Sequence, residues 1–239
     1  MVENGVDCLV IDVAHAHMER VIEVTREIKN AYPKILLIAG NVATYDATKD
    51  LYEAGADVVK VGVGPGSICT TRIETGHGVP QLTAIMEASR AAKEYNKTLI
   101  ADGGIKNSGD IVKALAAGAH AVMLGNMLAG TEESPGEIFE SNGKKLKKYF
   151  GSTSLEQKEK HLENLKNDQN YLKHIEGVSG AVIYKGSVVP LLDRVKASVC
   201  SGLSYSGAFN IFELQNNAQF VTITSAGLKE SNSHDLLQY

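Results

Sequence analysis

The stretch Glu53-Ala-Gly-Ala-Asp-Val-Val-Lys-Val-Gly62 decides the fold, because it recurs as Ala116-Ala-Gly-Ala-His-Ala-Val-Met-Leu-Gly125. A looser copy, Glu3-Asn-Gly-Val-Asp-Cys-Leu-Val-Ile-Asp12, opens the chain. Each copy is typical of a helix end closed by its glycine and followed at once by a short apolar strand. Uninterrupted apolar strands are typical of parallel sheets, in which the strands are buried on both faces.

The segments between these copies predict two more strands, over residues 35–39 and 98–101. Four helices are predicted in the gaps, over residues 17–31, 43–54, 82–95 and 108–117. Strands that alternate with helices at this spacing form right-handed βαβ units around a parallel sheet.

Every predicted strand ends in a polar or glycine-rich cluster, such as Asp102-Gly-Gly104 and Gly125-Asn126. In a (β/α)8 barrel the ends of all strands meet on one face, where the active site lies. A doubly wound open sheet would bind ligands at a switch point and open its first helix with a G-x-G-x-x-G turn, which is missing here. We therefore predict an α/β fold of the TIM (β/α)8 barrel class.

The barrel is predicted to be incomplete, because about five C-terminal strands precede residue 131, whereas a closed barrel has eight. The chain is predicted to form a single catalytic domain over residues 1–239, truncated at its N-terminal side. This domain divides into barrel units at 1–130, a hairpin and mobile flap at 131–185, and a C-terminal segment of helix and strand at 186–239.

Composition excludes several classes of protein. A formal net charge of -4 and a pI near 6.0 leave no basic surface for nucleic acid. No apolar run reaches the roughly 18 residues of a membrane span, and no signal peptide opens the chain. Three cysteines do not make a disulfide framework, so a cytoplasmic protein with reduced thiols is expected. The densest basic run is interpreted as a solvated hairpin tip: Lys144, Lys145, Lys147 and Lys148.

The segment Gly62-Val-Gly-Pro-Gly-Ser-Ile-Cys-Thr-Thr71 is the most specific chemical signal. A strand that runs into such a glycine-rich turn leaves backbone amides and carbonyls uncovered, and these can hold an anion or a cation. Cys69 follows this turn in a polar loop, which suits a nucleophilic thiol. Cys8 and Cys200 are instead predicted to be small buried residues.

Asp102-Gly-Gly104 and Gly125-Asn126 end the next two predicted strands. In barrel enzymes the loops after the late strands usually bind phosphate through backbone amides. A carboxylate at a strand tip suits a ribose diol as a bidentate acceptor. The alternative for Asp102 is plain turn chemistry, because Asp-Gly-Gly is also a good turn sequence.

Together these motifs resemble the IMP dehydrogenase / GMP reductase family, and the likeness covers nearly the whole chain. The segments that carry it are Gly62–Thr71, Ile100-Ala-Asp-Gly-Gly-Ile105, Val122-Met-Leu-Gly125, Ser134-Pro-Gly-Glu137 and Glu230-Ser-x-x-His234. The family barrel has three further strands before the part matched here.

The resemblance implies a covalent mechanism on a purine nucleoside monophosphate (GMP, IMP or XMP). Cys69 would add to C2 of the purine, with Thr71 beside it as a hydroxyl that handles protons. Glu176 would contact the base. The residues expected to bind the nucleotide ribose and phosphate are Ser67, Asp102, Gly104, Gly125, Asn126 and Tyr149.

The resemblance also implies a nicotinamide cofactor, NAD or NADP, and a potassium ion. The cofactor pocket would be lined by Asp12, Ala14, Asn41 and Gly62. Potassium would be held by carbonyls of Gly64, Gly66 and Cys69, and by Glu230, Ser231 and Asn232 from a neighbouring subunit. That shared site implies a homotetramer. The reaction that the resemblance implies is hydride transfer between C2 and the nicotinamide.

Two members of the family remain open. The dehydrogenase activates water with an Arg-Tyr pair on a mobile flap, but here the flap reads Asn170-Tyr171 with no arginine. The reductase releases ammonia from GMP with the loop threonine and a flap glutamate, which here is Glu156, next to the aligned Leu155. The sequence narrowly favours a GMP reductase (GMP and NADPH to IMP and ammonia) over an IMP dehydrogenase (IMP, NAD and water to XMP).

Two rival classes stay open as well. An inactive barrel fragment that needs a partner is one, because a five-strand piece leaves two open sheet edges. Another phosphate-binding barrel, such as an isomerase or aldolase, is the other, and it would have no need of Cys69.

Overall fold

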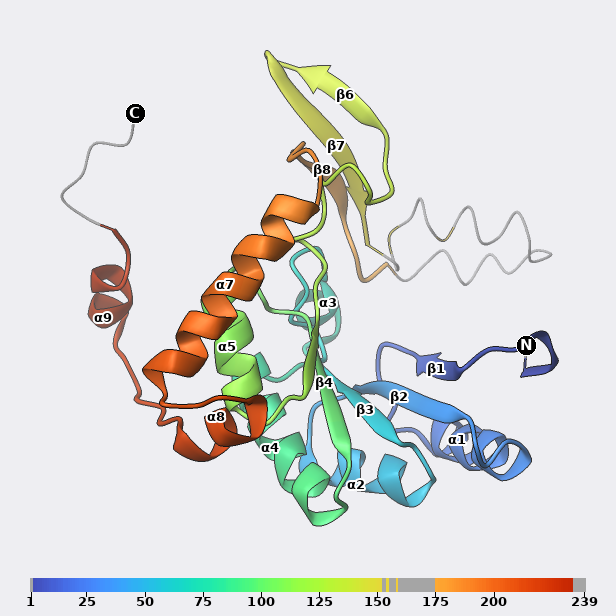
Figure 1. Cartoon of the computed structure of the whole chain (residues 1–239). Helices are drawn as coiled ribbons and strands as arrows, with labels where there is room; N and C mark the ends of the chain where they lie inside the picture. The colour runs from blue at the N-terminus through green and yellow to red at the C-terminus, as the bar shows by residue number, and fades with distance from the viewer. Residues whose placement is uncertain (1, 152–153, 155–157, 159–174, 234–239) are drawn as a thin grey trace.

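The computed structural model describes residues 2–151, 154, 158 and 175–233. Its centre is a five-stranded parallel sheet in which the strands pair in chain order (Figure 1). These strands are β1 (Cys8–Asp12), β2 (Leu36–Val42), β3 (Val58–Val61), β4 (Thr98–Asp102) and β5 (Ala121–Met123). All five predicted strands are therefore confirmed.

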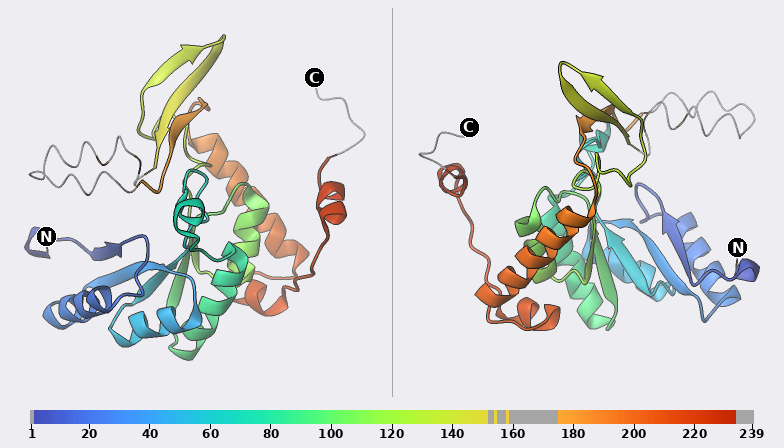
Figure 2. Two further views of the ribbon diagram at one scale, coloured as in Figure 1. Left: turned by 180° about the vertical axis from the view of Figure 1, so that it is seen from behind. Right: turned by 45° about the horizontal axis from the view of Figure 1, so that its top comes forward.

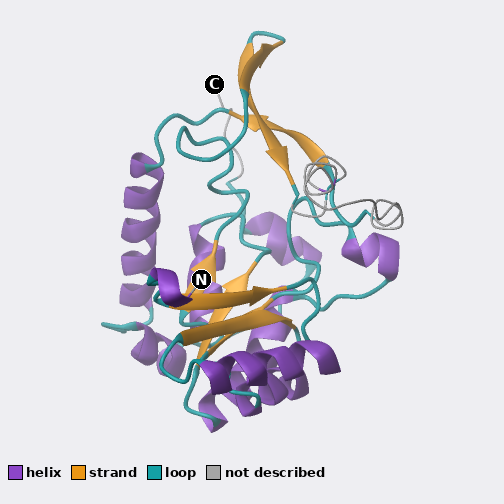
Figure 3. Ribbon diagram, turned by 90° about the vertical axis from the view of Figure 1, so that its right-hand side faces the viewer, coloured by secondary structure: helices purple, strands orange, loops and turns teal. Residues whose placement is uncertain are grey.

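The helices between the strands also match the predicted ranges, to within two residues at each end. They are α1 (Glu19–Ala31), α2 (Tyr45–Glu53), α4 (Gln81–Glu94) and α5 (Ser108–Ala116). A short 3-10 helix, Val2–Asn4, precedes β1, and the five-residue α3 (Thr71–Thr75) follows the cysteine loop. Each long helix packs against the next one along the chain, so they form a single layer over the sheet (Figure 3). An unreversed strand order with one helical layer has no switch point and is the arrangement of consecutive barrel units.

Glycines close two helices where the repeat predicts them. Gly55 and Gly118 have φ angles of 106° and 117°, a left-handed conformation that side chains rarely adopt. At Gly118 an added Cβ would lie 2.3 Å from the Ser89 Cβ of α4. The glycine therefore allows the chain to turn from α5 into β5 while it stays close to the neighbouring helix.

The core lies between the sheet and its helices. Leu37, Leu51, Val59 and Leu99 are at most 1% exposed. The prediction that every strand is buried on both faces is wrong for the two outer strands, β1 and β5. In β5, for example, Met123 is 43% exposed. Outer strands have a neighbour on one side only, and no second helical layer covers the other face within the described residues.

A second, antiparallel sheet lies beyond the same end of the parallel strands as α3 (Figures 1 and 2). It consists of β6 (Ile138–Ser141), β7 (Lys144–Phe150) and β8 (Ser179–Ile183). The predicted hairpin over 136–149 is confirmed, with Asn142 and Gly143 at positive φ in its two-residue turn. The third strand, β8, was not predicted. The loop or charged helix expected at 154–174 lies almost entirely outside the described residues.

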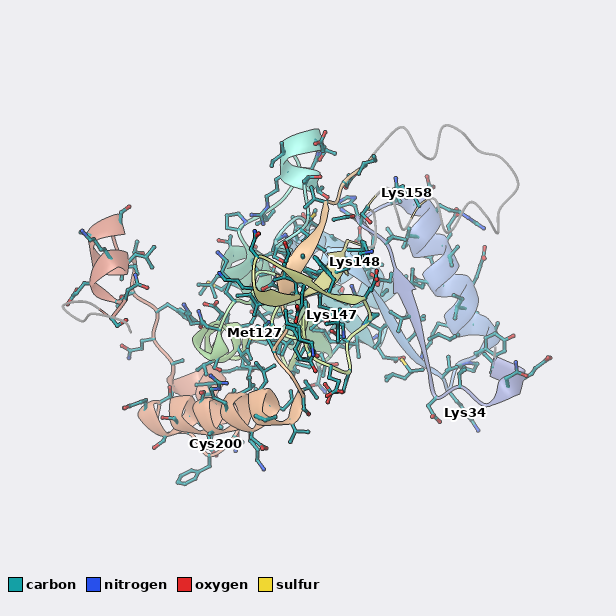
Figure 4. All side chains as sticks on the ribbon, turned by 90° about the horizontal axis from the view of Figure 1, so that it is seen from above. Lys34, Met127, Lys147, Lys148, Lys158 and Cys200 are labelled. Atoms are coloured by element: carbon teal, nitrogen blue, oxygen red, sulfur yellow. The ribbon has the colours of Figure 1, made fainter. Side chains whose placement is uncertain are left out.

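Lys147 corrects the interpretation of the basic run as a solvated tip. The tip is Asn142-Gly143, whereas Lys147 lies within β7 and is 2% exposed. Its ammonium donates to the carbonyls of Thr131 (2.7 Å) and Glu132 (3.1 Å), and also to that of Ser134. Strand alternation turns this side chain inward while Lys148 faces outward. Lys147 therefore ties the hairpin to the loop that follows β5 (Figure 4).

The C-terminal part consists of α7 (Val189–Tyr205), α8 (Ile211–Asn217) and α9 (Ser225–Glu230). The strand expected between 186 and 239 is absent from its described part, 186–233. The helices α7 and α8 pack on α5, around a small core that includes Ile111, Leu115 and Leu214. Among the described helices, none is long and apolar enough to cross a membrane.

Two cysteines also differ from expectation. Cys200 is exposed on α7 (Figure 4). Cys8 is half-buried, so neither cysteine is the buried residue that was predicted. Cys8 lies on the first strand of the sheet, where burial is incomplete, and Cys200 lies on a helix with no fully buried residue. Partial burial still raises the pKa of the Cys8 thiol.

Replacing Lys147 with methionine should lower the free energy of unfolding by about 2 kcal/mol or more. Methionine keeps the apolar stem but leaves three carbonyls without their charged donor. Lys144→Met, at an exposed position of the same strand, should change it by less than about 0.5 kcal/mol. Urea unfolding measures both, and equal losses would contradict the structural role of Lys147.

Candidate active site

The candidate site lies at the carboxyl ends of the parallel strands. Because the five strands are parallel, the residues that end them share one edge, where Asp12 ends β1 and Asp102 ends β4. The cysteine loop leaves the same edge from β3 and leads into α3. The predicted gathering of polar residues at one edge is therefore confirmed.

Close packing at this edge explains the glycines of the cysteine loop. Gly62 has a φ of 147°, and an added Cβ would lie 2.0 Å from the carbonyl oxygen of Asp102. An added Cβ at Gly103 would lie 2.8 Å from Pro65 Cγ. The cysteine loop and the Asp-Gly-Gly turn therefore lie directly against each other, which requires glycine on both sides.

Cys69 belongs to a line of three hydrogen-bonded side chains. Its thiol donates to Thr71 Oγ1 at 3.1 Å, and that hydroxyl donates to Glu176 Oε2 at 2.6 Å. Cys69 is half-buried, and Thr71 is 9% exposed. A proton can therefore pass from the thiol to a carboxylate through one hydroxyl, which is the arrangement of an activated nucleophile.

Backbone pairing brings Glu176 to the cysteine loop from a distant part of the chain. Thr70 N donates to Glu176 O at 2.9 Å, and Val178 N donates to Ile68 O at 3.0 Å. These bonds form a short antiparallel bridge beside Cys69. The sequence assigned Glu176 to the base and Glu156 to the proton transfer with Thr71. Glu156 lies outside the described residues, and Glu176 is the carboxylate that the structure places on Thr71.

A second cluster joins the ends of the first four strands around Lys60, which is 2% exposed. The Lys60 ammonium donates to Asp12 Oδ1 at 2.8 Å and to Asp102 Oδ2 at 2.5 Å. Asn41 Nδ2 donates to Asp102 Oδ2 at 3.0 Å and to Gly62 O at 2.7 Å. Three of the four residues expected to line the cofactor pocket therefore share one network with Asp102.

Sequence reasoning missed Lys60 and also Gln81, which donates to Val61 O at 2.9 Å and Asp102 O at 3.1 Å. A signal for Lys60 was present, since it is the only charge in the apolar run Val58-Val-Lys-Val61. A buried ammonium is costly unless it is paired, so a lysine in such a strand indicates carboxylates nearby. Nothing in the sequence around Gln81 separates it from an ordinary helix-start residue.

Two of the expected phosphate contacts, Gly125 and Tyr149, lie close together. An added Cβ at Gly125 would lie 3.3 Å from the Tyr149 hydroxyl, so the loop after β5 and the end of β7 face each other. A cavity of about 780 Å³ lies between them, with Gly125, Ser134 and Tyr149 among its lining residues. Its size suits a small-molecule ligand.

The remaining expected ligand contacts lie around these two clusters. Gly104 lies next to Gln81 and Pro65, while Ser67 and Ala14 are exposed at the same edge. Asn126 is exposed, and its carbonyl accepts a hydrogen bond from Lys185 at 3.1 Å.

The two halves of the expected potassium site are not brought together within the chain. Gly64, Gly66 and Cys69 belong to the cysteine loop, and the Gly66 carbonyl accepts a bond from Cys69 N at 3.2 Å. Glu230, Ser231 and Asn232 lie at the end of α9, which stands apart from the sheet (Figures 1 and 2).

The loop that follows β1 contains His15 and His17, and His77 lies nearby. Partial burial lowers the pKa of His15, and the nearby His17 and His77 lower it further. The His15 imidazole, next to Ala14, is therefore less readily charged than an ordinary histidine.

Comparison with known proteins places this geometry in a family. The model of the IMP dehydrogenase / GMP reductase domain matches residues 1–234. The chain belongs to the IMP dehydrogenase / GMP reductase family. The resemblance inferred from the cysteine loop and the strand ends is thereby confirmed.

The relatives of this family member include both enzymes. It is 55% identical over 238 residues to the inosine-5'-monophosphate dehydrogenase of Aquifex aeolicus (strain VF5), and 51% identical over 239 residues to that of Staphylococcus aureus (strain Mu50 / ATCC 700699). A crystal structure of GMP reductase C318A from Trypanosoma brucei in complex with guanosine 5'-monophosphate superimposes with a TM-score of 0.93 at 44% identity. Each match covers 99% of this chain and 49% of the relative, so the chain spans about half the length of these proteins.

Thr71→Val should slow the alkylation of Cys69 by iodoacetamide at neutral pH by at least about tenfold. The valine keeps the shape of the side chain but removes the hydroxyl that passes the proton to Glu176. Thr71→Ser keeps the hydroxyl and should react at nearly the wild-type rate. Mass spectrometry of the Cys69 peptide measures the rate, with the exposed Cys200 as an internal reference. An unchanged rate in Thr71→Val would refute the proton path.

Proposed function

We propose that the chain carries the nucleotide-binding and catalytic part of an NAD(P)-dependent oxidoreductase that acts at C2 of a purine nucleoside monophosphate. The line Cys69–Thr71–Glu176 is the observation that carries this proposal. The alternative of an isomerase or aldolase predicts no need for Cys69, so this line of side chains favours the oxidoreductase.

The chemistry follows from the arrangement of these side chains. The Cys69 thiol loses its proton through the Thr71 hydroxyl to Glu176, and the thiolate adds to C2 of the purine. In the reductive direction the 2-amino group would leave as ammonia after protonation, and a bound reduced nicotinamide would supply the hydride that C2 needs. Breaking the carbon–sulfur bond releases IMP and restores the thiolate.

The other clusters orient the nucleotide for this step. Asp102 accepts hydrogen bonds from the ribose diol, while backbone amides after β5 and the Tyr149 hydroxyl hold the phosphate. Fixing the nucleotide at both ends holds C2 against the thiol, which is how positioning raises the rate.

The residues at the ends of β1 and β2 fit a nicotinamide cofactor. The Asp12 side chain is 63% exposed. Within the described part of the chain, Asn41 Oδ1 is buried and has no hydrogen-bond partner, so it is ready to accept one from a ligand amide. We assign the cofactor to this side of Cys69, with Asp12, Ala14, Asn41 and Gly62 as its contacts.

The direction of the reaction has two candidates. We favour GMP reduction, because ammonia release needs a hydroxyl that handles protons and Thr71 is paired with a carboxylate. The IMP dehydrogenase relatives at 51–55% identity support IMP oxidation as the second candidate. The flap residues that distinguish the two, Glu156 and Asn170-Tyr171, lie outside the described residues.

We further propose that the sheet is a section of a (β/α)8 barrel within one catalytic domain over residues 1–239. The unreversed strand order and single helical layer support this. The separation of α9 from the cysteine loop supports a potassium site completed by a neighbouring subunit in a homotetramer, with loop carbonyls as the first half of its ligands.

A 2-chloropurine nucleoside monophosphate should label Cys69 covalently. The thiolate displaces chloride from C2 and leaves a stable thioether, which mass spectrometry detects as a mass increase on the Cys69 peptide. Cys200 is the control within the same molecule, because it is exposed on α7, which contributes none of the proposed site residues. Equal labelling of both cysteines, or equal labelling by the nucleoside without phosphate, would refute a nucleotide site at Cys69.

Nicotinamide absorbance distinguishes the two directions in the full-length protein. We expect oxidation of NADPH with GMP and little reduction of NAD with IMP. Cys69→Ala should abolish turnover while nucleotide binding stays within about threefold of wild type, since the thiol acts only in the chemical step. Reduction of NAD with IMP would establish the dehydrogenase instead, and turnover by Cys69→Ala would refute covalent catalysis.

A further inference from the structure

Lys60 is a buried charge that the proposed mechanism does not use. Its side chain is 2% exposed and lies in the most buried strand of the sheet, β3. An isolated ammonium in such a place is costly, so its stabilisation depends on the two carboxylates that it contacts, Asp12 and Asp102. Two negative charges share one positive charge, which leaves the cluster with a net charge of about -1.

Within the described residues, only one oxygen of each carboxylate is hydrogen-bonded, which leaves the other oxygen for a ligand. Lys60 binds Asp12 through Oδ1 and Asp102 through Oδ2, and Asn41 also binds Oδ2 of Asp102. Among the residues that the structure describes, no donor reaches Asp12 Oδ2 or Asp102 Oδ1. The protein therefore holds each carboxylate through one oxygen. The other oxygen of each can accept a hydrogen bond from a hydroxyl group of a ligand.

The neighbouring strand is shaped to admit Lys60. An added Cβ at Gly40 would lie 2.6 Å from the Lys60 carbonyl oxygen and 2.7 Å from its Cβ. Gly40 itself has no positive φ, so this steric contact, not the backbone conformation, is what requires glycine there. A side chain at position 40 would displace Lys60 from between the carboxylates.

We propose that Lys60 is a positioning residue that orients two ribose-binding carboxylates at once, Asp102 toward the nucleotide and Asp12 toward the dinucleotide. This inference rests on the proposed function, because that function assigns the two aspartates to different reactants. Lys60 itself touches neither reactant. Its removal therefore weakens the recognition of ribose hydroxyl groups in both subsites, whereas removal of one aspartate affects only its own subsite.

Ribose discrimination in the full-length protein tests this directly. Calorimetry gives the dissociation constants of GMP and of its 2′,3′-dideoxy counterpart. The dissociation constant of the dideoxy compound divided by that of GMP, called the ribose ratio, measures what the ribose hydroxyls contribute to binding. Hydrogen bonds to a positioned carboxylate should make the wild-type ratio about tenfold or more. In Lys60→Gln the ratio should fall to within about threefold of one, and the dissociation constant of NADPH, followed by its fluorescence, should rise by about tenfold.

Lys29→Gln is the matched control. Lys29 also pairs with an aspartate of the sheet region, at 2.6 Å from Asp57, but at the opposite end of the strands. It should lower stability without changing the ribose ratio. If the role of Lys60 were purely structural, Lys60→Gln would likewise lower stability and leave the ribose ratio at its wild-type value. A wild-type ribose ratio in Lys60→Gln would therefore overturn the inference.

Asp12→Asn tests one half of the inference, the assignment of Asp12 to the dinucleotide, even if Lys60→Gln does not fold, because the Asp12 side chain is largely exposed. It should weaken NADPH binding by about tenfold and leave the GMP ratio unchanged. Unchanged NADPH binding would overturn the inference. A wild-type protein that binds neither GMP nor IMP would overturn the proposed function, which is a different result from a folded Lys60→Gln variant that discriminates normally.

Discussion

A single buried ammonium governs the arrangement of the candidate site. Lys60 lies in the most buried strand, and the free energy of placing its charge there is offset only if carboxylates reach it. Asp12 and Asp102 do so from β1 and β4, at the ends of strands that flank β2 and β3. The carboxyl edge is therefore held by an electrostatic contact across three strand pairs, in addition to the backbone hydrogen bonds of the sheet. The glycines at 40 and 62 are needed because this edge is packed so closely.

The cysteine loop depends on a second constraint, imposed from outside the parallel sheet. Residues 68–70 pair with residues 176–178, so the polypeptide beyond the hairpin returns to cover the loop. This return places the Glu176 carboxylate on Thr71 and pairs Cys69 with Gly177. The thiol and the carboxylate that it reaches through Thr71 therefore come from two distant parts of the chain.

Much of the fold could be predicted because it is local and repetitive. Helix ends closed by Gly55 and Gly118 and followed by apolar runs predict strand and helix alternation directly. The prediction was weaker where tertiary contacts determine the outcome. Strand β8 pairs with β7 across a long separation, and the solvent exposure of Lys147 depends on which face of β7 meets the loop after β5. The described part of the C-terminal segment, 186–233, lacks the expected strand, because α7 and α8 pack some of their apolar side chains against α5 instead.

The sequence by itself determined the class of fold, the family, the cysteine loop and the strand-end residues, because each rests on short motifs whose residues act locally. Tertiary structure alone decided which carboxylate contacts which side chain: Glu176 contacts Thr71, and Asp12 and Asp102 contact Lys60. Glu176 is 105 positions from Thr71, and Lys60 is 48 and 42 positions from its two aspartates. Contacts between such distant positions depend on the register of the sheet and on the return of the chain, neither of which leaves a periodic signal in the sequence. The physical reason is that a buried charge or a proton path needs partners within about 3 Å, and only the folded chain brings them there.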